Sequence, residues 1–488
     1  MERETEPSDA ASGAVPPDRP QDGFRRHAAA AIERIAAYFE NIEAWPVFPP
    51  TRPGQVRAAL PPAPPEEPEP MDRILADFDR LILPNTTHWN HPGFFAYFPA
   101  SSTEPGIIGE LLAAALNANA MVWRTGPAAT ELEQHVLGWL RQLLALPEGW
   151  FGVINDTASS STLYALAAAR EAHPELRVRE DGLAGRPDLP RLRVYCSEEA
   201  HSSVDKAAIT LGLGLSGVRR IPTDERLRLD PAALEAAIAE DRAAGIRPLA
   251  VVATVGTTST TAVDPVPAIA DICEREGLWL HIDAAYGGAA AILPEMRWIF
   301  DGCDRADSLV TNPHKWLFTP LDCSVLFTRR PDVLRRAFSL TPFYLTTAEG
   351  EEAVNLMDYG LALGRRFRAL KLWFILRYYG REGIRAILRE HLRLARLFAS
   401  WVDAAPDFER LAPTDFSVVV FRHHPVGHPG GEALDALNER LLHRVNASGE
   451  VFLSQTRVNG RYALRLAIGN PRTTEAHVRR AWDLLREQ

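Results

Sequence analysis

The sequence predicts an α/β fold with a mostly parallel, doubly wound central sheet and a small α+β domain after it. Two observations predict this fold. Short β-rich segments alternate with helical segments between residues 191 and 328, which is typical of parallel sheets. Beyond residue 376, helices precede a strand and a hairpin. We expect a leader and an N-terminal helical arm at 1–100, a large α/β domain at 101–375 and a small α+β domain at 376–488.

Composition limits the function classes. The 488 residues are 46% hydrophobic and 24% charged, which is ordinary globular composition and excludes a disordered or collagen-like chain. The net charge of −10 argues against a nucleic-acid partner. No segment approaches the ~18 apolar residues of a membrane span, and the acidic start lacks a signal peptide's apolar core. Four distant cysteines indicate reduced thiols, no cysteine metal site and a cytoplasmic protein.

The first hundred residues predict a helical arm. We expect residues 1–22 to be disordered and residues 24–38 to form an alanine-rich amphipathic helix. The proline-dense segment 46–70 should hold neither helix nor strand, and a second helix should follow over 71–83. A lone helix pair cannot bury its own apolar faces, so it needs the main body or another subunit to pack against.

The middle of the chain carries the strands of the predicted sheet. The β-rich runs are 191–196, 249–256, 278–283, 308–312 and 323–328. Helical patterns such as 231–245 and 265–277 separate some of them, and ligands of such sheets bind at the carboxyl ends of the strands. The glycine pattern at 212–217 follows a helical pattern and precedes a strand. It therefore predicts a helix-to-strand turn rather than a nucleotide site.

In the last part of the chain the predicted helices and strands follow one another in a different order. A basic helix is expected from residue 364, with helical pattern continuing to Phe398. A strand is expected at 416–423 and a hairpin at 451–469. The hairpin should turn at Asn459-Gly460, because this dipeptide is the strongest short hairpin signal.

Lysine is scarce, which narrows the candidates for lysine chemistry. Of 53 basic residues only Lys206, Lys315 and Lys371 are lysines. Lys315 follows a short apolar run and lies between His314 and Trp316. A partly desolvated lysine beside a cation has a lowered pKa and can attack a carbonyl as the free amine. Lysine usually lies on the surface, and Lys206 and Lys371 fit that role better than Lys315 does.

Three further features lie at the same predicted sheet edge as Lys315. Asp283 ends a strand, Asp156–Thr162 precedes a helix, and His201 opens a helix directly after a strand. Each feature alone could be a helix cap or a core residue. Together they are the parts of a pyridoxal 5′-phosphate (PLP) site. The lysine binds the aldehyde, the aspartate keeps the pyridine nitrogen protonated, and the helix N-terminus binds the phosphate.

Several motifs resemble those of the group II PLP-dependent decarboxylases, and most closely the aromatic-L-amino-acid decarboxylases. The similarity runs from about Phe24 to the C-terminus. It implies the type I (aspartate-aminotransferase-like) fold, PLP as cofactor, and a homodimer whose N-terminal helices lie across the partner subunit. The motifs are HWNHPGFFAYFP (88–99), TELE (130–133), AHSSV (200–204), ATVGTT (253–258), HIDAAYGG (281–288), NPHKW (312–316) and LGRRFRALKLWF (363–374).

The resemblance also implies roles for individual residues. Lys315 matches the lysine that binds PLP covalently, Asp283 the acid on the pyridine nitrogen, and His201 the imidazole stacked on the ring. Tyr344 matches a tyrosine of a mobile loop that protonates the substrate carbon, and Arg465 a family arginine whose role the sequence does not give. The other expected cofactor contacts are Thr157, Ala158, Ser159, Thr258, Ala285, Asn312 and His314.

The expected substrate site has an aromatic wall formed by Trp89, Tyr97, Phe98 and Pro99. Three positions depart from the animal enzymes. Ala100 replaces a usual threonine, while Asn119 and Met121, expected to reach the neighbouring site, replace bulkier apolar groups. Gly364 matches the small residue of plant relatives that take indole substrates. It therefore favours tryptophan over phenylalanine, tyrosine or DOPA.

The leading hypothesis is decarboxylation of an aromatic L-amino acid to its amine and carbon dioxide. An aldehyde synthase of the same family would lack the loop tyrosine or the ring-stacking histidine, whereas Tyr344 and His201 are both present. A decarboxylase of glutamate, cysteine sulfinate or histidine would need a polar pocket in place of FFAYFP.

A PLP-binding regulator would need a basic DNA-binding head, but residues 1–70 are acidic and proline-rich. An inactive scaffold would be expected to lose Lys315 or Tyr344.

Overall fold

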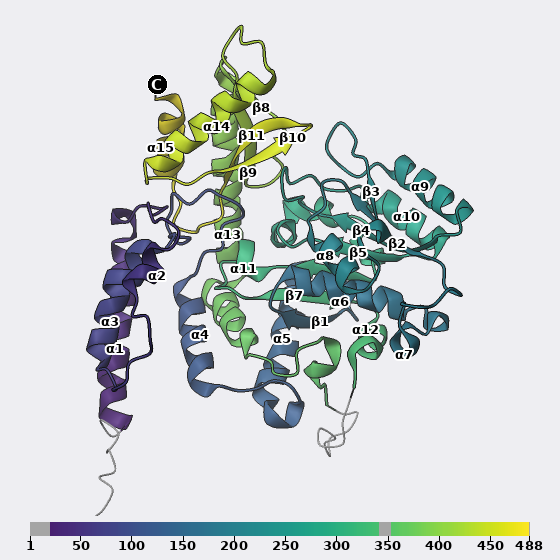
Figure 1. Ribbon diagram of the computed structural model, residues 1–488, viewed down its shortest axis with the longest axis horizontal. Helices are drawn as coiled ribbons and strands as arrows, with labels where there is room; N and C mark the ends of the chain where they lie inside the picture. Colours follow the sequence, from purple (N-terminus) through teal and green to yellow (C-terminus); the bar gives the residue numbers. More distant parts are fainter. Residues whose placement is uncertain (1–19, 341–352, 488) are drawn as a thin grey trace, which may run out of the picture. The chain divides into compact units, whose positions relative to one another are not determined.

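The computed structural model describes residues 20–340 and 353–487. The chain divides into two compact units, one ending at His88 and the other beginning at Trp89. Figure 1 shows the course of the chain through both units.

The first unit holds the predicted helical arm. Helix α1 (Pro20–Glu40) and helix α3 (Met71–Asp77) are joined by an ion pair between Arg34 Nε and Asp79 Oδ2, 3.0 Å apart. The chain after α3 continues as a π-helical turn (Phe78–Ile82) and a 3-10 turn (Leu83–Asn85). The expectation that 46–70 holds no helix was wrong. A proline-free run forms the short helix α2 (Gln55–Ala59), which follows Gly54 at a φ of +87°.

The second unit contains the expected central sheet (Figure 1). Its seven strands have the order β1-β7-β6-β5-β4-β2-β3. Strands β2 to β6 pair in parallel, and β7 runs antiparallel to both β6 and β1. The five predicted β-rich runs all form strands, whereas β1, an edge strand, was not predicted. The bounds are β1 Phe151–Asn155, β2 Leu192–Ser197, β3 Val218–Ile221, β4 Arg247–Thr254, β5 Trp279–Asp283, β6 Ser308–Thr311 and β7 Ser324–Thr328.

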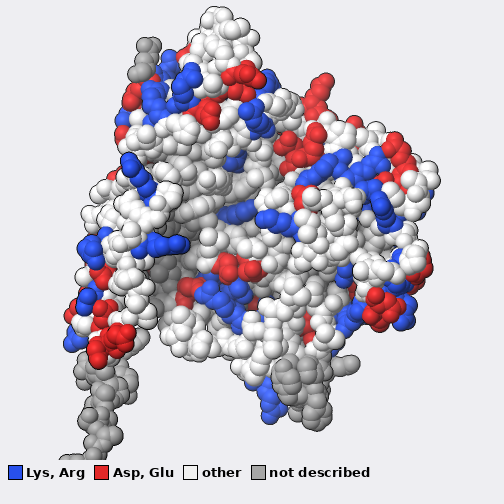
Figure 2. Space-filling model, in the orientation of Figure 1, with Lys and Arg blue, Asp and Glu red and all other residues white. Residues whose placement is uncertain are grey.

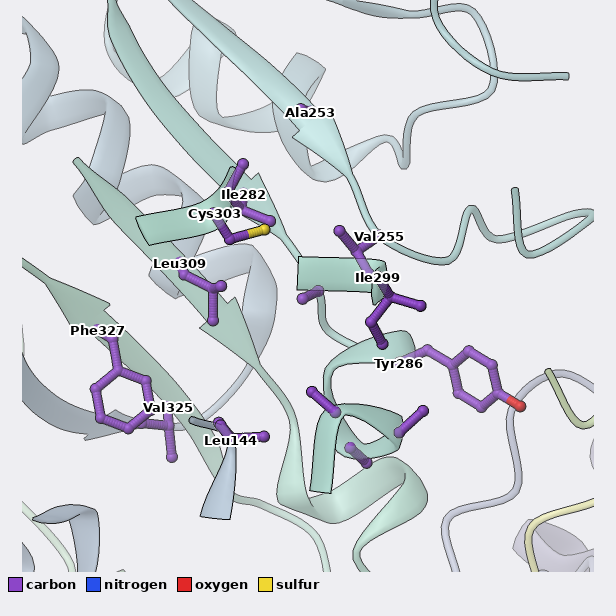
Figure 3. Close-up of a cluster of buried hydrophobic side chains, with 14 of the residues drawn as sticks. Leu144, Ala253, Val255, Ile282, Tyr286, Ile299, Cys303, Leu309, Val325 and Phe327 are labelled. Atoms are coloured by element: carbon purple, nitrogen blue, oxygen red, sulfur yellow. The ribbon is translucent and has the colours of Figure 1, made fainter. Parts of the chain in front are cut away.

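Helices cover both faces of this sheet. On one face, Ile282, Leu309 and Phe327 pack in a cluster that also contains Leu144, just after α5 (Figure 3). On the other face, Trp279 and neighbouring apolar side chains pack beneath α6. The glycine pattern at 212–217 lies between α8 and β3, as predicted. The bounds are α4 Glu104–Leu116, α5 Pro127–Leu143, α6 Ala158–Glu171, α7 Val178–Asp181, α8 Ser203–Thr210, α9 Pro231–Ala243, α10 Val266–Glu276, α11 Pro313–Trp316 and α12 Pro331–Phe338.

The C-terminal part has the predicted α+β composition. Helix α13 (Arg368–Ala404) runs through residue 375 and has a non-helical residue at Gly380. Residues after it form an antiparallel sheet of order β10-β11-β9-β8. The hairpin turns at Asn459 and Gly460, at φ of 49° and 76°, which confirms that prediction. The division of the chain into three domains stays a prediction. The bounds are β8 Phe408–Arg410, β9 Val418–His423, α14 Gly431–Ala447, β10 Ser454–Val458, β11 Arg461–Ala467 and α15 Glu475–Arg486.

The charges on the surface and the hydropathy of the helices agree with the composition of the sequence. Lysine and arginine side chains lie beside aspartate and glutamate side chains over much of the face shown in Figure 2. Within residues 20–340 and 353–487, no helix has both the length and the apolar character needed to span a bilayer.

Candidate active site

The predicted cofactor residues gather at one edge of the central sheet. Strand β5 ends at Asp283, β6 leads into Asn312 and helix α11, and β2 leads through a turn to His201. Strand β1 leads into α6, the predicted phosphate helix. Because these strands all run in the same direction, their carboxyl ends meet at a single edge.

Lys315 has the environment of a nucleophilic amine. It lies on α11, and its backbone N–H donates to the Asn312 carbonyl at 2.9 Å. Burial lowers its pKa, the Asp283 carboxylate opposes this change, and the nearby Arg465 cation lowers the pKa further. A lysine with a lowered pKa is available as the free amine, the form that attacks a carbonyl.

Lys315 faces an aromatic column. Its Nζ lies 5.0 Å from the centroid of the Phe98 ring. The Phe98 ring stacks on Tyr286 at 3.9 Å between centroids and 18°, and Tyr286 stacks on Trp316 at 4.8 Å and 11°. The guanidinium carbon of Arg465 lies 5.3 Å from the same Phe98 centroid. The Phe98 face is therefore a platform for cations as well as part of the predicted aromatic wall.

The base of this column is fixed by a buried histidine. The Trp316 indole N–H donates to Nδ1 of His391 at 3.0 Å, and the Nε2–H of His391 donates to the Asn470 carbonyl at 3.1 Å. An imidazole that accepts at one nitrogen and donates at the other is neutral. Burial accordingly lowers the pKa of His391 to about 4. This pair ties the residue after Lys315 to the C-terminal part.

Asp283 is buried at the end of β5. Its Oδ1 accepts a hydrogen bond from the Ala285 backbone N–H at 3.1 Å. The neighbour of Asp283 in β4 is Thr254, whose Oγ1 is buried and has no hydrogen-bond partner among the described residues. A buried polar atom without a partner costs free energy, so its presence here fits a site that receives a polar ligand.

His201 lies exposed at the same edge. Its Nδ1 accepts a hydrogen bond from the Ser203 backbone N–H at 3.1 Å, so the neutral ring carries its proton on Nε2. Desolvation lowers the pKa of His201, and the Asp283 carboxylate opposes this effect. A neutral imidazole at this position suits the predicted stacking on the cofactor ring.

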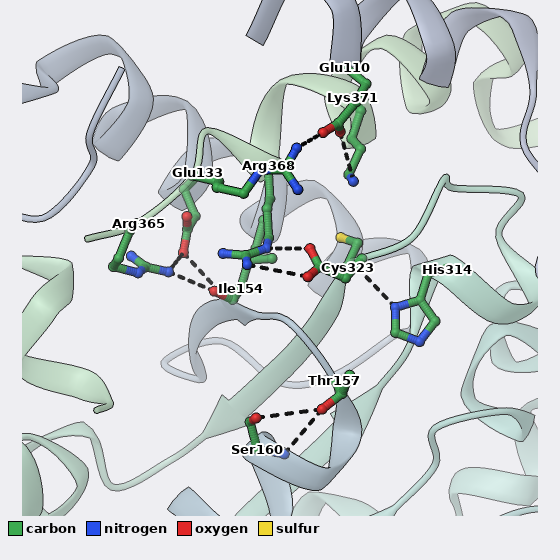
Figure 4. A network of polar contacts seen from close by, with 12 residues as sticks. Glu110, Glu133, Ile154, Thr157, Ser160, His314, Cys323, Arg365, Arg368 and Lys371 are labelled. Atoms are coloured by element: carbon green, nitrogen blue, oxygen red, sulfur yellow. Dashed lines mark hydrogen bonds and ion pairs between the residues drawn. The ribbon is translucent and has the colours of Figure 1, made fainter. Parts of the chain in front are cut away.

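The N-terminus of α6 forms the expected phosphate cradle. Thr157 caps the helix, and its Oγ1 accepts from the Ser160 N–H at 3.4 Å (Figure 4). Ala158 and Ser159 are its first two residues, where backbone amides lack partners within the helix. Nδ1 of His314 accepts from the Cys323 N–H at 2.9 Å, which places the imidazole proton on Nε2. Burial lowers the pKa of His314 to about 4.

Asn312 supplies a further test of the cofactor fit. Its side-chain Oδ1 is buried and has no partner among the described residues. A half-turn of the amide would present its NH2 donors, which suit a phosphate. The cradle of α6, the amine of Lys315 and the carboxylate of Asp283 complete the set for a ligand that has a phosphate, an aldehyde and a basic ring nitrogen. The residues present therefore suit PLP.

Arg465 is the residue whose role the sequence did not give. It lies buried on β11, where its Nε donates to the Ser259 carbonyl at 2.9 Å and its Nη1 to the Tyr97 carbonyl at 3.2 Å. Its Nη2 is buried without a partner among the described residues. Burial lowers its pKa to about 10, so the group stays cationic at neutral pH. A spare charged donor close to Lys315 suits a substrate carboxylate.

Thr258, predicted to contact the cofactor, is exposed in the loop after β4, and its role stays a prediction. The threonine beside Asp283 is Thr254. Sequence reasoning missed Thr254, although its place at the end of β4 was the available signal. The prediction for Tyr344 lies outside the described residues.

The aromatic wall is partly assembled. Trp89 and Tyr97 stack at 5.8 Å between centroids and 21°, and both rings are exposed. Pro99 is buried beside Gly469, where an added Cβ would lie 3.3 Å from the proline ring. Ala100 is half-buried. Trp89 and Tyr97 thus form an exposed aromatic surface.

The remaining predicted substrate residues lie elsewhere. Asn119 and Gly364 line a cavity of about 500 Å³ between α4 and residues 364–368. The Asn119 Oδ1 accepts from the Arg365 N–H at 2.9 Å, and a Cβ added to Gly364 would lie 4.0 Å from the Asn119 Nδ2. Met121 is half-buried next to this segment, and its carbonyl accepts from the Met357 N–H at 3.0 Å. Gly364 thus has room for a larger side chain.

The prediction that Lys371 lies on the surface was wrong. This lysine is fully buried, and its Nζ lies 2.8 Å from Oε2 of Glu110 (Figure 4). The backbone of Gly109 in α4 packs so closely that an added Cβ would lie 2.7 Å from the Lys371 Cα. Burial lowers the pKa of Lys371 to about 8. The basic face of α13 is therefore covered by α4, which composition alone did not reveal.

A second buried ion pair fixes the approach to the phosphate helix. Nη2 of Arg365 donates to Oε1 of Glu133 at 2.9 Å and to the Ile154 carbonyl at 2.7 Å (Figure 4). The same Glu133 oxygen accepts from the Ile154 N–H at 2.8 Å. Both backbone groups of Ile154, the penultimate residue of β1, are thus held just before α6 begins.

The comparisons with known proteins agree with this geometry. Residues 53–424 match the pyridoxal-dependent decarboxylase conserved domain. The chain is 40% identical over 486 residues to a tryptophan decarboxylase of Camptotheca acuminata, covering 98% of this chain and 96% of the relative. It is also 40% identical over 487 residues to a phenylacetaldehyde synthase of Arabidopsis thaliana, covering 98% of each.

A solved structure gives the same result. The crystal structure of Oryza sativa TDC with PLP and tryptamine is similar with a TM-score of 0.92 and 38% identity, covering 97% of this chain and 98% of that one. The predicted type I fold and the PLP cofactor are confirmed. The chain belongs to the pyridoxal-dependent decarboxylase family, and it is a PLP-dependent decarboxylase.

Proposed function

We propose that the protein decarboxylates an aromatic L-amino acid to its amine and carbon dioxide, and that it prefers tryptophan-type substrates to phenylalanine, tyrosine or DOPA. The observation that carries the proposal is that Lys315 Nζ and the Arg465 guanidinium both lie over the ring of Phe98, a residue of the predicted aromatic wall. Exposed aromatic rings suit an aromatic side chain, and the spare Nη2 of Arg465 suits the carboxylate. The similarity to a tryptophan decarboxylase supports the same substrate class.

The cofactor residues have separate roles in this proposal. Lys315 binds PLP covalently, and Asp283 pairs with the pyridine nitrogen. His201 covers one face of the ring, and Ala285 the other. The phosphate is bound by Thr157, Ala158, Ser159, Asn312 and His314. When bound, PLP accepts the electron pair of the bond that breaks.

The substrate is positioned by the protein. Trp89 and Tyr97 bind the aromatic side chain, and Arg465 binds the carboxylate from the side of Phe98. Tyr344 delivers the proton to the substrate carbon after carbon dioxide has left, as the sequence resemblance implies. These roles place the carboxylate before reaction and determine where the new proton goes.

We also propose that the protein is a cytoplasmic homodimer. Helix α4 exposes Ile108, Leu111, Leu112 and Leu116, and the arm exposes further apolar side chains such as Phe24 and Ile74. Apolar surface of this extent is stabilised by a second copy of the chain. In such a dimer Asn119, Met121 and Gly364 would contribute to the partner's substrate site.

A substrate panel tests the proposed function. Purified enzyme is assayed for amine and carbon dioxide with tryptophan, 5-hydroxytryptophan, tyrosine, DOPA, phenylalanine, glutamate and histidine. We expect the highest kcat/KM with an indole substrate and the lowest with glutamate or histidine. A higher kcat/KM for glutamate than for every aromatic substrate would refute the proposal.

The variant Gly364→Ser tests whether residue 364 determines which aromatic substrate is preferred. The added side chain should reach toward Asn119, where the wild-type surface is open. We expect it to lower kcat/KM for tryptophan relative to tyrosine. An unchanged ratio of the kcat/KM values for tryptophan and tyrosine would show that Gly364 is not part of the substrate site. The substrate panel alone would then test the preference for aromatic substrates.

Aldehyde synthesis is the second candidate, because a phenylacetaldehyde synthase is among the similar proteins. Two residues distinguish the amine-forming enzymes from the aldehyde synthases, and both of them, His201 and Tyr344, are present in this chain. Aldehyde and hydrogen peroxide should therefore be minor products in the same assays, and equimolar aldehyde and peroxide would favour the second candidate.

A further inference from the structure

Tyr97 has a backbone conformation that bulky residues rarely adopt. Its φ is 54°, in the left-handed region, where the Cβ atom crowds the backbone. Such a conformation costs free energy and persists only where neighbouring groups hold it. The Tyr97 ring stacks on Trp89, whereas the next ring, Phe98, stacks on Tyr286 and faces the Lys315 amine. The backbone at Tyr97 therefore determines where both rings lie.

Two side chains of the hairpin at 451–469 hold this backbone. The Tyr97 N–H donates to Ser454 Oγ at 3.1 Å, and the Tyr97 carbonyl accepts from Nη1 of Arg465 at 3.2 Å. The preceding segment 93–95 is held differently, because its backbone pairs with the backbone of Phe452 and Ala467. At Tyr97 side chains take over this pairing, so the strained conformation depends on their identity.

Ser454 also holds Arg465 directly. The two residues lie opposite each other in the pair of β10 and β11, and Nη1 of Arg465 donates to Ser454 Oγ at 3.1 Å. Backbone and guanidinium N–H groups can only donate, so the Ser454 oxygen accepts both of its hydrogen bonds. Ser454 is buried, with 4% of its surface exposed. One enclosed hydroxyl therefore connects the backbone of the aromatic wall with the buried cation.

The contacts of Arg465 leave one end of its guanidinium free. Nη1 uses its two hydrogens on Ser454 and on the Tyr97 carbonyl, and Nε–H donates to the Ser259 carbonyl. Thr456, on β10, fixes that loop by donating to Ser259 Oγ at 2.9 Å. Both hydrogens of Nη2 remain without a partner among the described residues. The groups that hold Tyr97 therefore also determine the direction in which the spare donors point.

We propose that Ser454 is a positioning residue that contributes to substrate specificity. Its hydroxyl holds Tyr97 in the left-handed conformation and orients Nη2 of Arg465 for the substrate carboxylate. It thereby sets the separation between the aromatic surface and the carboxylate site, and favours amino acids that match this separation. The inference rests on the proposed function, in which Tyr97 binds the aromatic side chain and Arg465 the carboxylate.

Ser454→Ala removes the hydroxyl, and the holoenzyme is used for the test. We expect KM for tryptophan to rise by about ten-fold, as for the loss of a hydrogen bond to a charged group. Binding of tryptamine, which has no carboxylate, is measured by isothermal titration calorimetry. It should weaken by only about three-fold, because the Tyr97 contact alone is affected. Unchanged values for both ligands would overturn the inference.

Two further variants separate positioning from a purely structural role. Ser454→Thr keeps a hydroxyl at the same place on β10 and should return both values to within about two-fold of wild type. Gln455→Ala, at the next and exposed position, is the matched control and should change neither value. The unfolding midpoint of each variant is measured in parallel. If Ser454→Ala lowers the midpoint and weakens both ligands by the same factor, Ser454 only supports the fold and the inference is overturned.

A double-mutant cycle separates this inference from the proposed function. If Arg465→Met alone leaves KM for tryptophan unchanged, the assignment of the carboxylate to Arg465 fails. If Arg465→Met raises KM, then Ser454→Ala in that background should add only about three-fold, because the guanidinium that Ser454 orients is gone. A loss as large as in the wild-type background would show that Ser454 does not act through Arg465, and would overturn the inference while leaving the proposed function intact.

Discussion

The Nζ atom of Lys315 lies 5.0 Å from the centroid of the Phe98 ring, whose other face is covered by Tyr286. The Lys315 amine therefore lies over an aromatic face that is supported by the Tyr286 ring. Arg465 approaches the same ring, and its positive charge lowers the pKa of Lys315. This arrangement places the proposed cofactor lysine close to the proposed carboxylate site.

Lys315→Ala should abolish covalent binding of PLP and block turnover. The reason is that Lys315 is the lysine at the carboxyl edge of the sheet, whereas Lys371 is buried against Glu110. The enzyme is treated with borohydride, digested, and the labelled peptide identified by mass spectrometry. Lys206→Arg is the control and should keep the label. A reduced cofactor attached to Lys206 or Lys371 would contradict the assignment.

Arg465→Met should raise KM for the amino-acid substrate by about 10- to 100-fold, because a hydrogen bond to a charged group contributes about 1.5–3 kcal/mol. PLP affinity should change little. Inhibition by tryptamine, which has no carboxylate, should also be nearly unchanged. If tryptamine inhibition weakens as much as substrate binding does, Arg465 supports the shape of the site rather than binding a carboxylate.

Glu133→Gln should destabilise the fold by about 3–5 kcal/mol, because it leaves the buried Arg365 guanidinium without its counter-charge. Urea unfolding followed by fluorescence measures the loss. Glu131→Gln, at an exposed position on the same helix, is the control and should change stability little. Replacing both Glu133 and Arg365 by Met should cost less than the single change. A larger loss in the double variant would contradict the buried-charge explanation.

His391→Gln should reduce the sensitivity of the fold to acid. The folded-state pKa of about 4 lies below the unfolded value of 6.5, so between these values only the unfolded chain is protonated. Stability is therefore fully present above pH 6.5 and falls as the pH falls toward 4. At about 1.36 kcal/mol per pH unit, this histidine accounts for about 2 kcal/mol between pH 6.5 and 5.

The measurement for His391 is the free energy of unfolding at pH 7, 6 and 5. Glutamine can still accept from Trp316 and donate to Asn470, but it does not titrate, so the pH slope should be shallower. His443→Gln, at an exposed histidine, should keep the wild-type slope. An unchanged slope in His391→Gln would show that His391 is not neutral in the fold.

Tyr344→Phe should lose most amine formation and gain aldehyde, ammonia and hydrogen peroxide. The phenol is the proposed proton donor, and without it the electron-rich state of the substrate carbon persists and can react with dissolved oxygen. Amine, aldehyde and peroxide are measured side by side in the same reaction. Unchanged amine production without peroxide would rule out this role.

The sequence predicted the features that depend on short segments. Apolar runs predicted five strands of the central sheet, and Asn459-Gly460 predicted the hairpin turn, because both signals are local. The common strand direction then brought His201, Asp283 and Lys315 to one edge, as expected. These features could be predicted without knowing which residues distant in the sequence contact one another.

Other features depend on long-range packing and could not be predicted in this way. Lys371 is buried because α4 packs on α13, and Arg465 reaches Phe98 because β11 lies close to the loop after β4. The place of Thr254 beside Asp283 depends on where β4 ends and on the register between β4 and β5. In each case the deciding neighbour is far away in the chain or lies on an adjacent strand.

The burial of Lys371 has a practical consequence for labelling. Of the three lysines, Lys371 is enclosed by protein, Lys315 is the proposed cofactor amine, and only Lys206 is exposed, on α8 close to His201. Amine-reactive dyes or resins applied to the folded protein should therefore attach at Lys206 and at the chain's α-amino group. A fluorophore on Lys206 would report directly on events at the mouth of the active site without an engineered cysteine.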